Sequence, residues 1–416
     1  MNRFIFKSYD FEKNTFVANF HYAFESGREF TEKVEFKSAG DYDEKLLGRA
    51  LFLAFILIGT SYYKTFPSRE VVVDCPIDKW QANFFNHVYQ EGLGQFAFEN
   101  DLTRDDLAHF IENSQVEAEP ISYQKTGILA LQSGGKDSLL TASLLKKQNL
   151  DFTAWYLSNG EFHPEVIDKL GVDVLVSKRI LDRSALESAA RDGALNGHVP
   201  ITYIVQSLAL IQAILLGKNE ILVSIAHEGE EPHHQIGDLM VTHQWSKTWQ
   251  AELDFAEYVH RYVSADIKIG SPLRKYSELR VAELFVESAW SEFGSEFSSC
   301  NTLNYSQGAD NRNLMWCSEC PKCANSYLLF APFLPSDDLK PIFGGVDLFT
   351  KPELVHTFMG LLGVNDVSKP FECIGEIDEL RLAYHMAIAK GDYAKLPFNV
   401  PESNFDYKQE YPSQLL

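Results

Sequence analysis

The sequence predicts an α/β protein: a parallel sheet with helices on both faces, an N-terminal α+β domain before it and a cysteine-bearing helical segment after it. Three observations predict this arrangement. Short apolar runs alternate with helical patterns in the middle of the chain, as in βαβ units. The first 120 or so residues alternate apolar and polar residues around turns, and four cysteines crowd together late in the chain. We expect three parts, residues 1–120, 121–298 and 299–416.

The sequence of residues 1–120 predicts a small antiparallel sheet followed by helices and a further strand. Its predicted strands cover residues 4–6, 15–24, 29–36 and 70–75, and its predicted helices cover residues 43–58, with Asp43 as the cap, and 78–90. Between them, Ser61-Tyr-Tyr-Lys64 has two readings. We favour a helix end with packed aromatic rings over a functional lysine from these residues alone.

The central part begins after an acidic, proline-containing linker at residues 117–120. We expect strands at residues 126–132, 152–157, 172–176 and 220–225, and helices at residues 137–147, 200–216 and 247–263. In a parallel sheet the ligand binds beyond the carboxyl ends of the strands. The loops after Gln132, Leu157 and Ile225 should therefore converge on one crevice.

Composition excludes several classes of function. The formal net charge is −21 and no dense run of Lys and Arg occurs, so a nucleic-acid partner is disfavoured. The N-terminus lacks the apolar region of a signal peptide. The most lipid-like segment, residues 46–60, is shorter than the roughly 20 residues that span a bilayer. We expect a cytoplasmic protein without a membrane partner.

The central part is organised around Ile128-Leu-Ala-Leu-Gln-Ser-Gly-Gly-Lys-Asp-Ser-Leu139, which reads as a buried strand, a glycine turn and a helix start. Glycine lets the backbone approach an anion closely, and the free N–H groups of a helix N-terminus attract negative charge. The loop therefore predicts a site for a phosphate chain. It is not a Walker A loop, because Ala130 stands where the first glycine belongs and Asp137 follows the lysine.

Residues Ser133, Gly134, Gly135, Lys136, Asp137 and Ser138 resemble the Ser-Gly-Gly-x-Asp-Ser loop of the N-type ATP pyrophosphatases. The resemblance implies the PP-loop (adenine nucleotide alpha hydrolase-like) fold and cleavage of ATP to AMP and pyrophosphate. The alternative is a glycine-rich turn without a ligand. The strand before the loop and the amphipathic helix after it favour the nucleotide site.

Four of the six cysteines predict a metal site. Cys300, Cys317, Cys320 and Cys323 have the spacing C-x16-C-x2-C-x2-C, and a Cys-x2-Cys turn presents two thiolates to one ion. Four sulfur ligands leave no open position, so we expect structural Zn²⁺. The alternative is a set of unrelated buried or redox-active cysteines.

Four further residues are candidates for chemistry. His198 precedes a long apolar helix, and His243 and Lys247 belong to His243-Gln-Trp-Ser-Lys247. A lysine in such a place can neutralise phosphate, or act as a base if burial lowers its pKa. Arg274, in the loop before a helix capped by Ser277, can hold a carboxylate. The alternatives are a packed or capping histidine, a solvated lysine and a surface ion pair.

The segment His227-Glu-Gly-Glu-Glu-Pro-His-His234 should lie beside the phosphate loop, because it follows a neighbouring strand of the sheet. We interpret His227, His233 and His234 as parts of a solvated loop rather than as ligands.

Two known families resemble this chain. The phosphate loop, Ser271-Pro-Leu and the four cysteines are similar to the 7-cyano-7-deazaguanine synthases, which are shorter and leave residues 1–120 unexplained. A fuller resemblance, nearly end to end, is to the UDP-N-acetylmuramoyl-L-alanyl-L-glutamate epimerase family. It is carried by Gly59-Thr-Ser-Tyr-Tyr-Lys64, Gly92-Leu-Gly-Gln-Phe-Ala97, Gly134-Gly-Lys-Asp-Ser138, Asn196-Gly-His-Val-Pro200, His243-Gln-Trp-Ser-Lys247, Phe297-Ser-Ser-Cys-Asn301, Trp316-Cys317 to Lys322-Cys323, and Lys369-Pro-Phe-Glu-Cys373.

The fuller resemblance implies an ATP- and Mg²⁺-dependent inversion of the terminal L-glutamate of a small molecule, UDP-MurNAc-L-Ala-L-Glu. A carboxyl-adenylate would make the α-proton acidic, with Lys247, His243, His198 and Lys64 as candidates, in that order, for base, acid or phosphate clamp. One departure is Ile225-Ala-His-Glu-Gly229, where the family carries an Asn-Glu-Arg-Ser type of segment. The alternatives are epimerisation of another C-terminal residue, a PP-loop amidase or nitrile synthase, and a non-catalytic nucleotide-binding protein.

Overall fold

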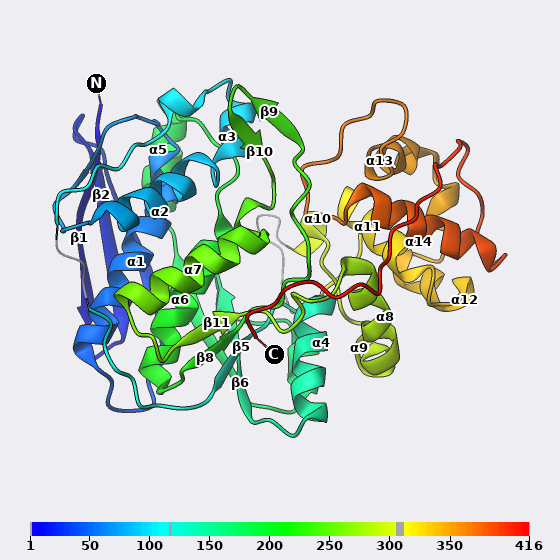
Figure 1. Cartoon of the computed structure of the whole chain (residues 1–416), viewed down its shortest axis with the longest axis horizontal. Coiled ribbons are helices and arrows are strands. Elements are labelled where there is room, and N and C mark those ends of the chain that lie inside the picture. The colour runs from blue at the N-terminus through cyan, green and yellow to red at the C-terminus, as the bar shows by residue number, and fades with distance from the viewer. Residues whose placement is uncertain (1, 116–118, 161, 305–311, 416) are drawn as a thin grey trace.

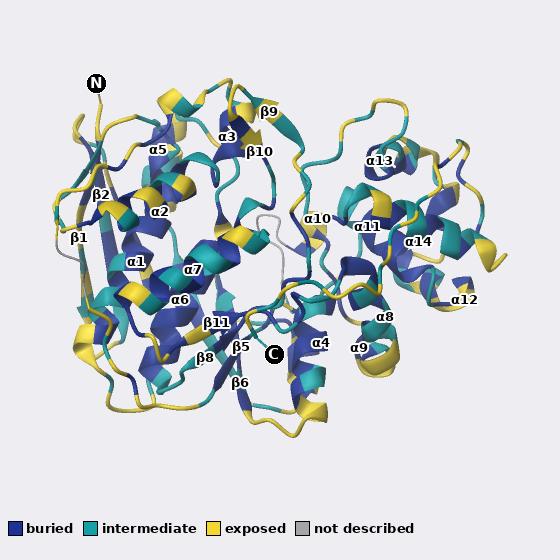
Figure 2. Cartoon of the chain, viewed as in Figure 1, coloured by how far each residue is buried: buried dark blue, intermediate teal, exposed yellow. Residues whose placement is uncertain are grey.

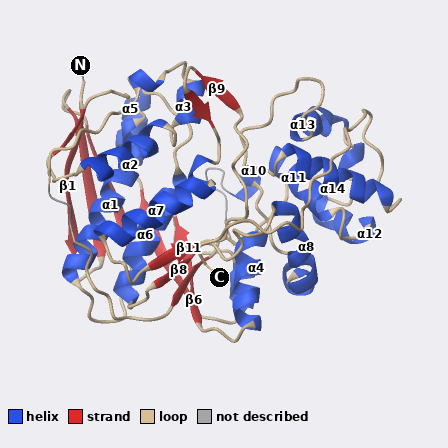
Figure 3. Ribbon diagram, in the orientation of Figure 1, coloured by secondary structure: helices blue, strands red, loops and turns tan. Residues whose placement is uncertain are grey.

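The computed structural model describes residues 2–115, 119–160, 162–304 and 312–415. Nine strands form one mixed sheet in the order β11-β8-β5-β6-β7-β3-β2-β1-β4. Figures 1 and 3 show this sheet in one half of the molecule and a helical C-terminal part beside it. The predicted linker at residues 117–120 lies partly outside the described residues.

The central strands are parallel, as predicted. They are β5 (Ile128–Leu131), β6 (Phe152–Ser158), β7 (Val174–Ile180), β8 (Glu220–Leu222) and β11 (Lys268–Gly270). Two differences from the prediction are β7, which continues to Ile180 instead of ending at Val176, and β11, which was not among the predicted strands. The extra residues of β7 pair with the N-terminal strands.

The N-terminal strands extend the same sheet. The strands β1 (Phe4–Glu12), β2 (Val17–Phe24) and β3 (Glu29–Glu35) are antiparallel, and β4 (Val71–Val73) lies parallel to β1. β3 pairs antiparallel with β7, from Lys33 opposite Ile180 to Glu35 opposite Lys178. The sheet is therefore continuous across the predicted boundary near residue 120.

One face of the sheet is covered by α1 (Glu44–Tyr63), α2 (Lys79–Gln90), α6 (Ile201–Leu216) and α7 (Trp249–Tyr262), and Figure 2 shows α1 and α6 as largely buried. The Asp43 carboxylate caps α1 by accepting from two backbone N–H groups, as predicted. The helix is longer than predicted: at 20 residues it could cross a membrane by length and composition, but 83% of its apolar window is buried within the fold. Within the described residues no other helix passes that test.

The opposite face carries α4 (Lys136–Lys147) and α8 (Glu278–Ser288). Strand β5 contributes side chains to the cores on both faces of the sheet. Leu129 belongs to the core under α1 and α6, whereas Ile128 and Ala130 belong to the core under α4. Ser277 caps α8 by accepting from the Arg280 N–H, as predicted. Helices on both faces of the sheet are thus confirmed.

The C-terminal part is helical and packs on α8. After the short helix α9 (Trp290–Phe293), this part contains α10 (Asn301–Asn304), α11 (Pro321–Phe330), α12 (Ser336–Leu339), α13 (Val355–Leu361) and α14 (Ile377–Ala389). Figure 1 shows α11 to α14 gathered at the end of the molecule farthest from the N-terminal strands. The remaining α-helices and strands of the described residues are α3 (Gly94–Glu99), α5 (Arg183–Arg191) and a hairpin of β9 (His234–Ile236) and β10 (Leu239–Val241).

Candidate active site

The loop between β5 and α4 has the backbone that an anion site requires. Gly134 has a φ of +77°, and Gly135 is the residue that precedes the first turn of α4. The Ser133 N–H donates to Ser138 Oγ at 3.2 Å, and the Gly135 N–H donates to Ser133 Oγ at 3.3 Å. Two serines therefore hold the loop in shape, with the N-terminus of α4 directed at it.

The loop is packed closely against the segment that bears the cysteines. A Cβ atom on Gly134 would lie 2.5 Å from Leu314 Cδ1, and the Ser298 N–H donates to the Gly134 carbonyl at 3.4 Å. Leu314 lies between the first two cysteines of the cluster in sequence. The shape of the loop thus depends on that segment.

Lys136 is buried between two carboxylates. Its Nζ lies 2.6 Å from Asp137 Oδ1 and 2.5 Å from Glu278 Oε2. Burial alone would lower the pKa of Lys136, but the charges of Asp137 and Glu278 outweigh it and raise that pKa. The first turns of α4 and α8 therefore bring one cation and two acidic groups together at the loop.

Lys247 lies in a short 3-10 turn, η3 (Trp245–Lys247), and α7 begins two residues later than predicted, with Thr248 as its cap. Its Nζ lies 3.3 Å from Glu228 Oε2. Burial would lower the pKa of Lys247, but the charges of Cys373, Glu228, Glu278 and Asp137 together raise it. Lys247 is thus close enough to the loop of residues 133–138, called the nucleotide loop below, to interact with its charges, and it stays protonated.

The segment after Ser224 lies near the nucleotide loop. The His227 N–H donates to the Tyr276 carbonyl at 2.8 Å, and Glu278, two residues after Tyr276, pairs with Lys136 at 2.5 Å. Burial would raise the pKa of Glu228, but Lys247, Lys322, Lys136 and Arg274 outweigh it and lower that pKa. This agrees with the position predicted for the segment from the order of the strands.

Arg274 is completely buried. Its Nε donates to Glu252 Oε2 at 2.9 Å, and its terminal nitrogens donate to the backbone carbonyls of Ala226 and Lys247 at 2.8 and 2.9 Å. The guanidinium joins the loop after β8 to the start of α7. In this structure it positions the Lys247 backbone instead of facing solvent.

His198, His243 and Lys64 form a second cluster. The two imidazole rings lie 4.6 Å apart, and Lys64 Nζ donates to Asn196 Oδ1 at 2.8 Å and to the Gly197 carbonyl at 2.6 Å. Burial, followed by the charges of His243 and Lys64, lowers the pKa of His198 to about 3. Burial, followed by the charge of Arg179, lowers the pKa of Lys64 to about 8. The cluster combines neutral imidazoles with a weakly basic lysine.

The histidines of residues 227–234 do not form the solvated loop expected from the sequence. His227 is half-buried and stacks on Tyr411, with ring centroids 3.6 Å apart. His233 and His234 are half-buried as well and pack on Phe371, with centroids at 5.1 and 5.5 Å. The sequence pattern did not reveal this packing, because the covering aromatic rings, Phe98, Phe371 and Tyr411, come from segments far away in the chain.

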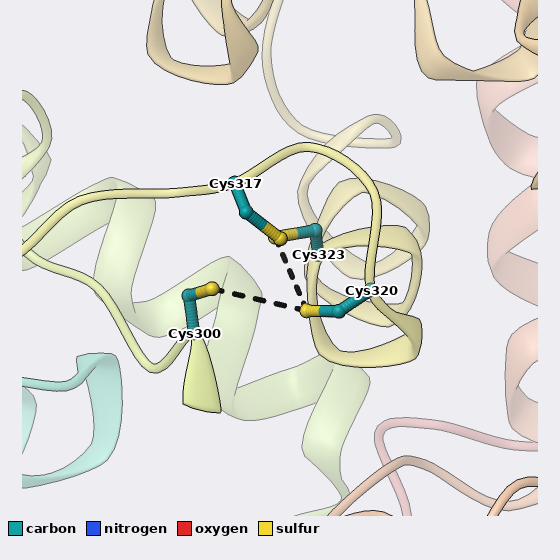
Figure 4. A group of neighbouring side chains, drawn as sticks. All are labelled: Cys300, Cys317, Cys320 and Cys323. Atoms are coloured by element: carbon teal, nitrogen blue, oxygen red, sulfur yellow. Dashed lines mark hydrogen bonds between the residues drawn. The ribbon is translucent and has the colours of Figure 1, made fainter. Parts of the chain in front are cut away.

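The four predicted cysteine ligands converge on one point (Figure 4). Their sulfur atoms all lie within 4.8 Å of one another, and three pairs are 3.5 to 3.8 Å apart. A tetrahedral zinc ion with Zn–S bonds of about 2.3 Å places its sulfurs about 3.8 Å apart. The cluster therefore fits a closed tetrahedral metal site, while disulfide bonds are absent among these four cysteines.

Comparison with known proteins matches both parts of the chain to one family. Residues 1–271 match the MurL N-terminal domain, and residues 296–405 match the MurL C-terminal domain. This chain belongs to the MurL family. Residues 272–295 lie between the two matched MurL regions.

Three relatives share the printed name UDP-N-acetyl-alpha-D-muramoyl-L-alanyl-L-glutamate epimerase. The protein of Xanthomonas oryzae pv. oryzae is 32% identical over 92% of this chain and 85% of its own length. That of Salinispora tropica is 31% identical over 91% and 83%, and that of a Micromonospora species is 29% identical over 95% and 89%. The family suggested by the sequence blocks is therefore confirmed.

Both MurL regions contribute to the site, and three contributors were missed from the sequence. Gln95 accepts at 2.5 Å from His243 Nδ1, and Cys373 Sγ lies 3.7 Å from His243 Nε2. Lys322, between the last two cysteines, adds its charge beside Glu228 and His243. All three stand in the blocks that carry the family resemblance, which was the signal available. Their contacts join segments that are far apart in the chain.

Proposed function

We propose that this protein is an ATP-dependent epimerase that inverts the terminal L-glutamate of UDP-MurNAc-L-Ala-L-Glu. The reaction would pass through a carboxyl-adenylate, release AMP and pyrophosphate, and take place in the cytoplasm for peptidoglycan synthesis. The observation that carries the proposal is the position of Lys247. Its Nζ lies 3.3 Å from Glu228 Oε2, and Arg274 holds its backbone carbonyl at 2.9 Å. The charges of Asp137 and Glu278 at the nucleotide loop and of Cys373 beside His243 raise its pKa.

The loop of residues 133–138 fits the phosphates of ATP and supports the PP-loop assignment. Its glycine backbone and the N-terminus of α4 offer N–H donors to an anion. Beside it, Gln132 Oε1 is a buried acceptor that lacks a hydrogen-bond partner among the described residues. A ligand donor such as an amino group or a metal-bound water would satisfy that oxygen.

Asp137 and Glu278 are the groups that we assign to Mg²⁺ bound with the nucleotide. Carboxylate oxygens are ligands that Mg²⁺ prefers, and both side chains approach Lys136 at the start of a helix. Magnesium would neutralise phosphate charge at this loop. Lys136 would then share the two carboxylates with the ion.

Adenylation makes the inversion possible. Removal of the α-proton from a free carboxylate would create a dianion, whereas an acyl-adenylate gives an enolate with one charged oxygen that a nearby cation stabilises. Lys247 is suited to be that cation because it stays protonated. A positioned base then needs to remove the proton, and general acid–base catalysis supplies roughly 10²- to 10⁴-fold in rate.

We assign the base to Lys64. Among the two candidate lysines it has the pKa nearer to neutrality, about 8, and it lies with His198 and His243 in one cluster. His198 and His243 are neutral near pH 7 and can relay a proton. Arg274 is a positioning residue, because its three hydrogen bonds hold Glu252, Ala226 and the Lys247 carbonyl.

The four cysteines would hold a structural Zn²⁺ ion. Four sulfurs close the coordination shell, so the ion would take no part in the reaction. Its contribution would be to fix the segment that packs on the nucleotide loop.

The test is to incubate the purified protein with UDP-MurNAc-L-Ala-L-Glu, ATP and Mg²⁺, and to determine the configuration of glutamate after acid hydrolysis. We expect D-glutamate, AMP and pyrophosphate without added ammonium. Glutamate that stays L while ATP is cleaved only with ammonium would identify an amidase and contradict the proposal. The same dipeptide without the UDP-muramyl group should react more slowly if that group is part of the substrate.

A further inference from the structure

Cys373 is a half-buried thiol in the loop before α14, outside the metal cluster. It closes the block Lys369-Pro-Phe-Glu-Cys373, to which the proposed function assigns no role. Of the six cysteines only Cys75 is comparable, since the other four form the metal cluster. Cys75 follows β4, which is an edge strand of the nine-stranded sheet.

The thiol is held against His243 by neighbours on both sides. Its Sγ lies 3.7 Å from His243 Nε2, and the Cys373 carbonyl accepts from Lys322 Nζ. The Gly375 N–H donates to Asn325 Oδ1 of α11 at 3.0 Å, and Lys369 pairs with Glu231 at 2.6 Å. The loop is thereby anchored at both ends around the thiol.

The hydrogen bonds of Gln95 determine which nitrogen of His243 carries a hydrogen. The Gln95 amide nitrogen donates to Glu99 Oε1 at 2.6 Å, so its oxygen faces His243 Nδ1 at 2.5 Å. An oxygen acceptor requires Nδ1 to carry the hydrogen. Burial, with Lys247 and Lys322 nearby, lowers the pKa of His243 to about 4 although Glu372 and Glu99 act in the opposite sense. The ring is neutral, and Nε2 presents a lone pair to the thiol.

We propose that Cys373, paired with His243, is the catalytic residue that exchanges a proton with the substrate α-carbon on one face, while Lys64 serves the other face. The inference rests on the proposed epimerase function. Inversion needs a proton donor opposite the base, because a single group that removes and returns the proton on the same face restores the original configuration. The Cys–His pair and Lys64 flank the same histidine cluster.

The proton balance closes without a further reactant. In the direction in which the thiol donates, Lys64 takes the α-proton and the Cα–H electron pair moves into the enolate of the acyl-adenylate. The enolate pair then forms a new Cα–H bond with the Cys373 proton, and the S–H electron pair stays on sulfur. Afterwards the Lys64 ammonium releases its proton to water, and a proton from water passes through His243 Nε2 to the thiolate. Lys247, a cation whose Nζ lies 3.3 Å from Glu228 Oε2, stabilises the thiolate and the enolate oxygen as they form.

The experiment compares Cys373→Ala and Cys373→Ser with the parent protein and with Cys75→Ser as a matched control. Each protein is incubated in deuterium oxide with ATP, Mg²⁺ and either the L-glutamate or the D-glutamate form of the nucleotide-linked dipeptide. Pyrophosphate, α-deuterium and glutamate configuration are measured together. The parent and Cys75→Ser should behave alike within about two-fold, because Cys75 lies outside the site.

For Cys373→Ala we expect pyrophosphate release to stay within about three-fold of the parent and inversion to fall by at least about 100-fold. Because Lys64 still works on its own face, deuterium should enter one of the two diastereomers and not the other. A structural role would not produce this one-sided exchange. Inversion at the parent rate, exchange into both or neither diastereomer, or loss of pyrophosphate in a normally folded variant would overturn the proposal. A covalent acyl adduct on Cys373 would also overturn it.

A second measurement covers variants that fail to fold. In the zinc-loaded Cys75→Ser protein, iodoacetamide should label Cys373 selectively, and the substrate with a non-hydrolysable ATP analogue should slow labelling at least about ten-fold. Unchanged labelling would contradict contact between Cys373 and the substrate. If the parent protein shows neither pyrophosphate nor inversion, the proposed function fails, and that result is distinct from a failure of the Cys373 variants alone.

Discussion

At the scale of single residues, two lysines of the site have opposite electrostatic surroundings. Lys64 donates to a side-chain amide and a backbone carbonyl, with Arg179 as a nearby like charge, and its pKa is lowered to about 8. Lys247 has carboxylates and a thiol around it, and its pKa is raised. From sequence, Lys247 was the first candidate for the base, because the residues beside it in sequence do not reveal the charges that surround it in the fold.

The lowered pKa of Lys64 predicts a pH dependence. A lysine base acts only when it is deprotonated, so kcat/KM for inversion should rise with pH through a midpoint of about 8. Lys64→Arg should lose inversion by at least about 100-fold and keep pyrophosphate release, since arginine stays protonated. If kcat/KM for inversion by Lys64→Arg still rises with pH through the same midpoint, the base is a group other than Lys64.

The raised pKa of Lys247 predicts that the residue contributes to α-proton exchange through its positive charge and does not itself transfer the proton. Lys247→Arg keeps a cation next to Glu228 and should retain about a tenth or more of the parent α-deuteration rate, whereas Lys247→Met should lose roughly 10²-fold or more. The measurement is α-deuterium incorporation at saturating ATP. Equal loss in the two variants would instead favour Lys247 as the base.

At the scale of elements, the cysteine-bearing segment supports the nucleotide loop. Ser298 donates to the Gly134 carbonyl, and Leu314 occupies the space that a side chain on Gly134 would need. Ser298 lies two residues before Cys300, and Leu314 lies between Cys300 and Cys317. The cysteine cluster and the loop of residues 133–138 are therefore linked through direct packing.

This link predicts that metal removal weakens ATP binding. Cys320→Ser should lower the zinc content from about one ion per chain and raise the Kd for ATP by about ten-fold or more, although Cys320 does not belong to the nucleotide loop. Zinc analysis and calorimetric titration with ATP measure the two effects. An unchanged Kd in zinc-free protein would show that the loop keeps its shape without the metal.

A buried carboxyl group of the C-terminal part, Glu379, contacts the first turn of α8, which also carries Glu278. Glu379 of α14 accepts from the Leu279 N–H at 2.7 Å, and its side chain is almost completely buried. Burial raises the pKa of Glu379 to about 8, and the charge of Glu278 acts in the same sense although the Leu279 N–H opposes it. The folded protein therefore holds a proton there that the unfolded chain releases at lower pH.

This acid predicts a fall in stability with rising pH. Between the ordinary value of 4.5 and about 8, the folded state binds more protons at Glu379 than the unfolded state, so the free energy of unfolding decreases as pH rises through this window. In Glu379→Gln the melting temperature should depend less on pH between 5 and 8. The exposed Glu187→Gln is the control and should melt like the parent at each pH. A parent-like slope in Glu379→Gln would contradict the assignment.

Periodicity predicted most of the elements, because a strand or helix that covers a core repeats its apolar residues locally. The strands β5, β6 and β8 and the caps Asp43 and Ser277 are where the sequence predicted them. The β9–β10 hairpin was missed, since its two three-residue strands lack alternation and pack under distant aromatic rings such as Phe98 and Phe371. Likewise, the pairing of β3 with β7 depends on a contact across about 145 residues of chain, which no local pattern encodes.

At the scale of the whole molecule, the continuous sheet and the helical C-terminal part together build one site. The first MurL region supplies the nucleotide loop, Lys64, His243 and Lys247, and the second supplies Lys322 and Cys373. The glycine turn between β5 and α4 and the convergence of the four cysteines could be predicted because each is a short motif. The Gln95–His243–Cys373 chain could not, because its three members come from segments more than 100 residues apart.

The most direct test of the central claim, that adenylation activates the substrate for proton exchange, is one incubation of the parent protein in deuterium oxide. With ATP, Mg²⁺ and UDP-MurNAc-L-Ala-L-Glu, we predict that pyrophosphate and D-glutamate carrying α-deuterium appear together, and that neither appears without ATP. Pyrophosphate without α-deuterium, or α-deuterium without ATP, would contradict the account.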